Sequence, residues 1–125
     1  MRGFTLLEIV MAIVVTVILS IPLSLTVSQY VKSVFFAQDM AMAVNLGRYE
    51  LERLNKMPYA GMAGASFPDD LGYGYDVDIT VVFIQGNASS AESLKQITVD
   101  VKKSGSATVL ASFVTYFAKN ILYGL

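Results

Sequence analysis

The chain has 125 residues, of which 54% are apolar, and its nine basic and ten acidic residues give a formal net charge of −1. This length suits one small domain plus a membrane helix, and the near-zero charge gives no electrostatic case for nucleic-acid binding. The absence of histidine and cysteine excludes disulfides and thiolate metal sites and removes the commonest general base. With no phosphate-binding glycine loop either, the sequence predicts no enzyme, no cofactor and no metal site.

An uncharged apolar run near the start is the dominant feature of the sequence. The nineteen residues from Ile9 to Val27 carry no formal charge, and as a helix they span roughly 28 Å, close to the thickness of a bilayer core. Directly before them lies Glu8, whose ionised carboxylate is costly in hydrocarbon unless it is paired. One interpretation is an ordinary membrane helix with an acidic first turn, which the helix dipole favours and which Arg2 can reach.

The residues around Glu8 point to a second interpretation. Gly-Phe-Thr-Leu-Leu-Glu followed by an apolar run resembles the class III signal of type IV pilins and type II secretion pseudopilins. The resemblance implies a leader, residues 1–3, that prepilin peptidase removes by cutting after Gly3 before it methylates the new amino terminus, Phe4. Arg2 matches the basic leader residue of the family, although a leader of Met1–Gly3 is unusually short.

The same resemblance implies how subunits assemble. Glu8 of one subunit is expected to meet the Phe4 amine of a neighbour when the amino-terminal helices bundle, an attraction that is large in a low-dielectric core. The implied partners are prepilin peptidase, other copies or other pilins in a helical filament, the inner-membrane assembly platform, and membrane lipid before assembly. A cleaved secretory signal fits poorly, because the apolar run is too long and no Ala-x-Ala site follows it.

A helix of about fifty residues is expected from near Thr5 to just before Pro58, where helical geometry is disfavoured. We expect residues 4–28 to form the transmembrane or filament-core part and residues 29–58 an amphipathic part. Pro22 is expected to kink or loosen the first part. The expected apolar stripe of the second part is Val34, Ala37, Ala41, Val44, Leu51 and Leu54. Two ion pairs at helical spacing are expected, Glu50 with Arg53 and Glu52 with Lys56.

Residues 59–74 are rich in glycine and are expected to form a loop. The nearby acids Asp69, Asp70, Asp76 and Asp78 are compatible with a calcium site, but their spacing matches no calcium loop, so solvated acids are the default interpretation. Asn87-Ala88-Ser89 has the form of an N-glycosylation sequon at a loop tip, and chance explains such triplets more often.

The remaining residues, 75–125, alternate as strands do. Strands are expected over Tyr75–Phe83, Ile97–Lys102 and Thr108–Phe117, with a polar loop over Gln85–Ser93, a turn at Ser104–Ser106 and an apolar tail over Asn120–Leu125. The predicted fold is therefore α+β, a long amino-terminal helix packed on a small antiparallel β-meander, which is also the fold that the pilin resemblance implies.

The sequence thus favours a structural subunit of a type IV pilus-like filament that serves adhesion, motility or DNA uptake. It is expected in the inner membrane as a single-pass precursor and then in a surface pilus or a periplasmic pseudopilus. A pseudopilin of a type II secretion system is the first alternative. A membrane-anchored domain with one span that never polymerises is the second.

Overall fold

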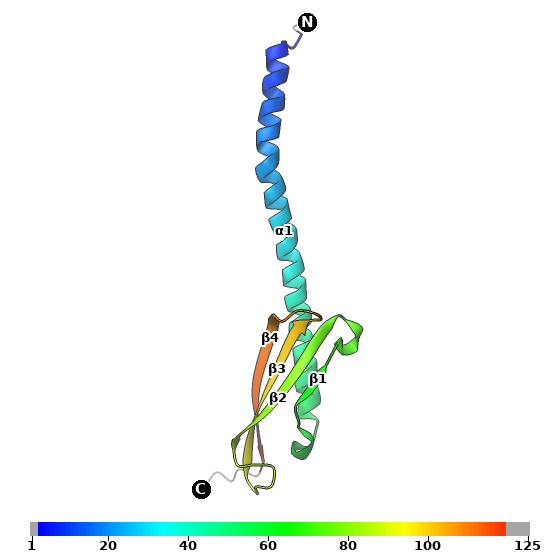
Figure 1. Cartoon of the computed structure of the whole chain (residues 1–125), viewed down its shortest axis with the longest axis vertical. Coiled ribbons are helices and arrows are strands. Elements are labelled where there is room, and N and C mark those ends of the chain that lie inside the picture. Colours follow the sequence, from blue (N-terminus) through cyan, green and yellow to red (C-terminus); the bar gives the residue numbers. More distant parts are fainter. Residues whose placement is uncertain (1–2, 120–125) are drawn as a thin grey trace. The chain divides into compact units, whose positions relative to one another are not determined.

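The computed structural model describes residues 3–119, apart from the side chain of Asp70. The elements are the helix α1 (Leu6–Asn55), the 3-10 turns η1 (Tyr59–Gly61) and η2 (Asp70–Gly72), and the strands β1 (Ala65–Phe67), β2 (Tyr75–Gln85), β3 (Ser93–Lys103) and β4 (Val109–Lys119) (Figure 1). The chain divides after Ala37 into an amino-terminal unit and a second unit, the head, which begins at Gln38. The expected leader residues Met1 and Arg2 and the tail Asn120–Leu125 lie outside the described residues.

The four strands form one antiparallel sheet in the order β1-β2-β3-β4, so each strand pairs with its neighbour in sequence. This arrangement, with the carboxyl-terminal part of α1 against the sheet, confirms the α+β fold and the antiparallel meander. The turn between β3 and β4 contains Gly105, whose φ of 80° suits glycine.

The strands differ from the sequence-based expectation mainly in one additional strand and in the start of β3, and the other strand ends differ by at most two residues. The stretch expected as loop contains β1, whose three residues pair with Val77–Ile79; a strand this short shows no alternation that a pattern can reveal. β3 begins at Ser93 rather than at Ile97. Its first residues include Lys95, a charged residue outside the expected strands whose side chain is buried in the structure.

The core of the head lies between the sheet and one face of α1. Its buried apolar residues are Ala43, Leu46, Leu54, Met62, Tyr75, Val77, Ile79, Ile97, Val99 and Val101. The buried face of α1 is rotated about the helix axis from the apolar stripe expected over Val34–Leu54. Of the six residues of that stripe, Leu54 is buried, Val44 and Leu51 are half-buried, and Val34, Ala37 and Ala41 are exposed.

The buried face of α1 in the head is built from Ala43, Leu46, Gly47, Glu50 and Leu54. Gly47 lets the ring of Phe113 in β4 approach the helix closely. The helix is apolar on several sides between Met40 and Val44, so hydrophobicity alone does not choose the face. The expected ion pair of Glu50 with Arg53 is confirmed at 2.7 Å, with the glutamate fully buried, whereas the described residues show no pair of Glu52 with Lys56.

Candidate functional site: the amino-terminal part of α1

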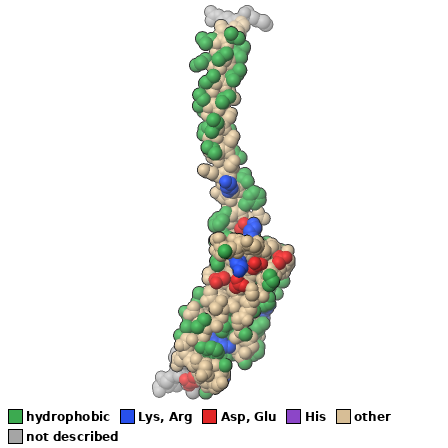
Figure 2. Space-filling model, viewed as in Figure 1, with side chains coloured by type: hydrophobic (Ala, Val, Ile, Leu, Met, Phe, Trp, Pro, Cys, Tyr) green, Lys and Arg blue, Asp and Glu red, His purple; other side chains and the backbone are tan. Residues whose placement is uncertain are grey.

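The amino-terminal unit ends at Ala37 within α1, and the apolar side chains of its described residues are exposed along its whole length. Phe4, Leu6 and Leu7 are the most exposed, at 83%, 81% and 72%. Figure 2 shows hydrophobic side chains all along the part of the helix nearest the amino terminus. The helix α1 is long and apolar enough to cross a membrane.

Glu8 closes the start of α1 through a reciprocal cap with Thr5. The backbone N–H and the hydroxyl of Thr5 donate to Glu8 Oε2 at 3.1 and 3.2 Å, and the Glu8 N–H donates to Thr5 Oγ1 at 3.3 Å. This is a capping box, with Thr5 just before the first helical residue, Leu6, and Glu8 three positions later. The sequence contains the Thr-x-x-Glu pattern that predicts a capping box, but the interpretation of Glu8 as a membrane residue did not include this role.

The two oxygens of the Glu8 carboxylate differ in their surroundings. Oε2 accepts both hydrogen bonds from Thr5, while Oε1 accepts none from the described residues. The residues that the sequence singled out, Gly3, Phe4 and Glu8, therefore gather at one helix end, where Gly3, Phe4, Thr5 and Glu8 line a recess of about 580 Å³. Among the described residues, the arrangement holds the carboxylate in place by one oxygen and provides no donor for the other.

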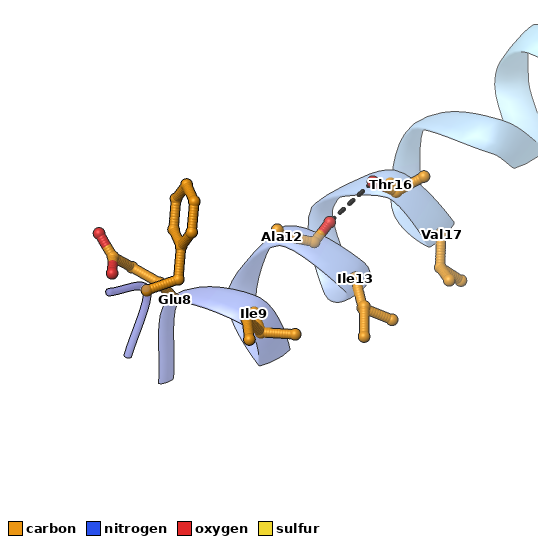
Figure 3. A pocket seen from close by; sticks show the side chains of 7 residues that line it. Glu8, Ile9, Ala12, Ile13, Thr16 and Val17 are labelled. Atoms are coloured by element: carbon orange, nitrogen blue, oxygen red, sulfur yellow. Dashed lines mark hydrogen bonds between the residues drawn. The ribbon is translucent and has the colours of Figure 1, made fainter. Parts of the chain in front are cut away.

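A shallow groove runs from this end along the helix surface. Phe4, Glu8, Ile9, Ala12, Ile13, Thr16 and Val17 line it over about 670 Å³. Figure 3 shows Glu8 at one end of the groove, and Ala12 and Thr16 one and two turns further along. The Thr16 hydroxyl donates to the Ala12 carbonyl at 2.7 Å, so this polar group is satisfied within the helix.

Small side chains continue the same row of the helix at four-residue spacing. Ser20 and Ser24 follow Thr16, and their hydroxyls donate to the carbonyls of Thr16 and Ser20 at 2.6 and 2.9 Å. A second groove, of about 320 Å³, lies at Ser20, Ser24 and Ser28. Rows of small residues of this kind let membrane helices approach one another closely.

Pro22 lies inside α1, and the helix continues through it without a break. The Thr26 hydroxyl donates to the Pro22 carbonyl at 2.9 Å. The carbonyl that the missing proline N–H leaves unbonded belongs to Ile18, four residues earlier, and no side chain among the described residues bonds it. The loosening of the helix at Pro22 remains a prediction.

The acidic residues of the head are tied to their neighbours. Asp76 accepts hydrogen bonds from the Ser104 hydroxyl and the Asp69 N–H, and these hold its pKa below the ordinary value of 3.8. The ammonium of Lys102, 2.7 Å away, does the same for the pKa of Asp78. No group of three metal-ligating side chains occurs among the described residues; the side chain of Asp70 lies outside them.

Asn87, the residue of the possible sequon, is exposed in the loop between β2 and β3. Its Oδ1 accepts hydrogen bonds from the Ser89 N–H and the Ser90 hydroxyl at 2.9 and 3.0 Å. The triplet therefore closes a turn, a structural role that accounts for the asparagine.

Comparisons of the chain with protein-family models, curated proteins and solved structures find no match.

Proposed function

We propose that this chain is a subunit of a pilin-like filament, made as a membrane precursor, cut after Gly3 and polymerised through the amino-terminal part of α1. The observation that carries the proposal is that only one oxygen of the Glu8 carboxylate accepts hydrogen bonds from the described residues. Thr5 bonds its Oε2, and no donor among residues 3–119 bonds its Oε1. Phe4, whose backbone nitrogen would become a free amine on cleavage, lines the same recess as Glu8.

The second observation that supports the proposal is the exposed apolar surface of α1 on the carboxyl-terminal side of Glu8. An exposed apolar helix is stable in lipid or against other apolar helices, and a small-residue row with shallow grooves favours the latter once subunits are brought together. In such a core, a neighbour's Phe4 amine supplies the cation that Glu8 lacks. Each charge alone is heavily penalised, so the pair fixes the axial position of one helix against the next.

One substitution separates the two roles of Glu8. Glutamine also completes a capping box, so Glu8→Gln keeps the local helix start while it removes the charge. We expect the Glu8→Gln chain to be membrane-inserted and cleaved as before but to be lost from sheared filaments. Thr5→Ala, which weakens the cap and keeps the charge, is the matched control and should still be incorporated.

Mass spectrometry of the amino terminus tests the processing step directly. A mature chain that begins at a methylated Phe4 supports the proposal. A chain that keeps Met1 and remains a dispersed monomer in lipid overturns it in favour of a non-polymerising membrane anchor, as would normal incorporation of Glu8→Gln.

A further inference from the structure

The outermost strand of the head, β4, has an open edge. It is the last strand of the sheet, and along its other side no strand pairs with it among the described residues. Natural edge strands are usually protected by charge, proline or a bulge. The ten residues from Val109 to Ala118 contain no charged residue and no proline. The pairing of β4 with β3 is irregular only near its start, between the partners of Val101 and Lys102. From Ala111 onward it is regular, so the N–H and C=O groups along the other side of β4 are available to another strand.

β2 has a second open edge at the other side of the sheet. β1 covers β2 only over Val77–Ile79, and from Thr80 to the irregularity between Phe83 and Gln85 no strand pairs with it on that side in the described chain. Both open edges lie at the same level: Val82 pairs with Gln96, which pairs in turn with Tyr116 on β4.

The exposed apolar side chains of the sheet gather on these two edges. Val82 and Val114 are 51% and 52% exposed, and Tyr116 is 58% exposed. A groove of about 470 Å³ lies beside β4 at this level, lined by Leu51, Glu52 and Asn55 of α1 and by Thr115–Ala118. The other end of the outer face carries Asp76, Asp78 and Lys102, whose charges oppose strand addition there.

From these features we infer that the carboxyl-terminal part of β4, Val114–Phe117, pairs with the open part of β2, Thr80–Phe83, of the next copy, since β1 occupies the β2 edge at Val77–Ile79. β2 and β4 run in the same direction, because both are antiparallel to β3. When two copies share one orientation, as chains that leave one membrane do, a β4–β2 pair between them is therefore parallel. A two-fold β4–β4 pair would turn the heads end for end, which does not suit chains that leave one membrane.

Each copy offers two different edges, so the contact is heterologous and does not close after two subunits. Contacts of this type generate open fibres. The inference rests on the proposed function and deepens it: heads, as well as helices, would hold neighbouring subunits together, through backbone hydrogen bonds and the burial of Val82, Val114 and Tyr116.

Disulfide trapping tests the contact, since the chain has no native cysteine. The full-length Val82→Cys/Tyr116→Cys variant, oxidised in its filaments or membranes, is expected to give a ladder of linked oligomers. Mixed single variants should give dimers only, and each single variant alone should give none. Moving the second cysteine to Ser112, Val114 or Ala118 fixes the register, and Thr108→Cys, in the exposed loop before β4, serves as the control for random collisions.

Three results would overturn the inference. They are the absence of cross-links while the thiols still react with maleimide, equal cross-linking through Thr108→Cys, and self-linking of Tyr116→Cys alone, which would indicate a two-fold β4 pair. Val114→Lys in the cross-linking background should abolish the ladder, whereas Thr98→Lys, on the same face one strand inward, should not. A missing ladder in filaments that still form overturns the strand contact alone, whereas an uncleaved, dispersed chain overturns the proposed function as well.

Discussion

The ring of Phe113 on β4 packs directly on the backbone of Gly47 in α1. A Cβ atom added at Gly47 would lie 2.6 Å from Phe113 Cδ2 and closer still to Cε2. Both residues belong to the head, and the glycine is buried. A residue that weakens a helix is therefore retained where it allows the helix and the sheet to approach one another.

Gly47→Ala should destabilise the head. Alanine favours a helix over glycine by about 1 kcal/mol, but forcing a methyl group into a packed core costs about 1–3 kcal/mol, so we expect a net loss of up to about 2 kcal/mol. Denaturant unfolding of the full chain in detergent measures it. Gly61→Ala is the matched control, because its added Cβ would meet only Pro58 at 3.7 Å. Phe113→Leu should relieve the Gly47→Ala defect; a more stable Gly47→Ala would contradict this account.

The capping box makes a second prediction, about helix stability alone. Thr5→Ala removes the hydroxyl that bonds Glu8, and loss of such a cap costs about 0.5–2 kcal/mol. We expect faster hydrogen exchange of the first-turn amides, up to Val10, with no change in the head. Thr5→Ser keeps the hydroxyl and should exchange like the parent chain. Equal exchange in all three chains would mean that the cap contributes nothing.

Much of this fold can be predicted from the sequence. The features that cannot be predicted all depend on contacts between residues far apart in the chain. The long helix, the antiparallel meander and the pairing of Glu50 with Arg53 come from local patterns of hydrophobicity and spacing. The buried face of α1 depends instead on which surface the sheet reaches, and the close fit of Gly47 with Phe113 involves residues 66 positions apart. Periodicity reports no such distant partner.

The same limit applies to the candidate site. Gly3, Phe4 and Glu8 lie within six residues of one another, so a short sequence motif identifies them. The structure places them at one helix end. The open edges of β2 and β4 escape a sequence reading, because an edge exists only once strand order is known. The uncharged run from Val109 to Ala118 by itself indicates an inner strand, because natural edge strands usually carry charge or proline.

Acidification should weaken the head through Asp39. The Tyr75 hydroxyl donates to one carboxylate oxygen at 2.7 Å and the Lys103 ammonium to the other at 3.0 Å, and both lower the pKa of Asp39 below 3.8. A carboxylate with a depressed folded pKa contributes stability that is present above its unfolded pKa and is lost as the pH falls through the folded value. We expect unfolding free energy to be steady near neutral pH and to fall below about pH 4.

Substitutions of Asp39 and Tyr75 test whether Asp39 causes the loss of stability at low pH. Asp39→Asn should be less stable than the parent at pH 7 and should lose less stability between pH 5 and pH 3, about the range in which carboxylates titrate. Tyr75→Phe removes the larger cause of the shift and should give an intermediate slope. The measurement is denaturant unfolding across that pH range, and equal slopes in all three chains would show that Asp39 is not responsible.

The buried ammonium of Lys95 fastens the segment after α1 to the sheet. Lys95 is only 5% exposed, and its Nζ donates to the carbonyls of Tyr59 and Met62, each at 2.9 Å. The ammonium also lies 4.4 Å from the centre of the Tyr59 ring, a favourable cation–π distance. A charge that sequence alone would assign to the surface thus bonds β3 to the segment that contains η1, in addition to the hydrogen bond of 2.8 Å between the Tyr59 hydroxyl and Ser93 Oγ.

Lys95→Met should release this segment while it keeps most of the apolar packing. The Met62 carbonyl loses its ammonium donor, and the Tyr59 carbonyl keeps only the Met62 N–H at 3.3 Å. A buried acceptor left without a partner costs about 1–3 kcal/mol. We expect residues 59–64 to become the first site of limited proteolysis, with the sheet amides of β3 and β4 still protected from hydrogen exchange. Lys119→Met, whose ammonium makes one longer bond of 3.3 Å to the Ser90 carbonyl, is the control and should leave cleavage unchanged. If Lys95→Met resists proteolysis as the parent does, the packing of the Tyr59 ring and its hydroxyl bond to Ser93, rather than the ammonium, hold η1 in place.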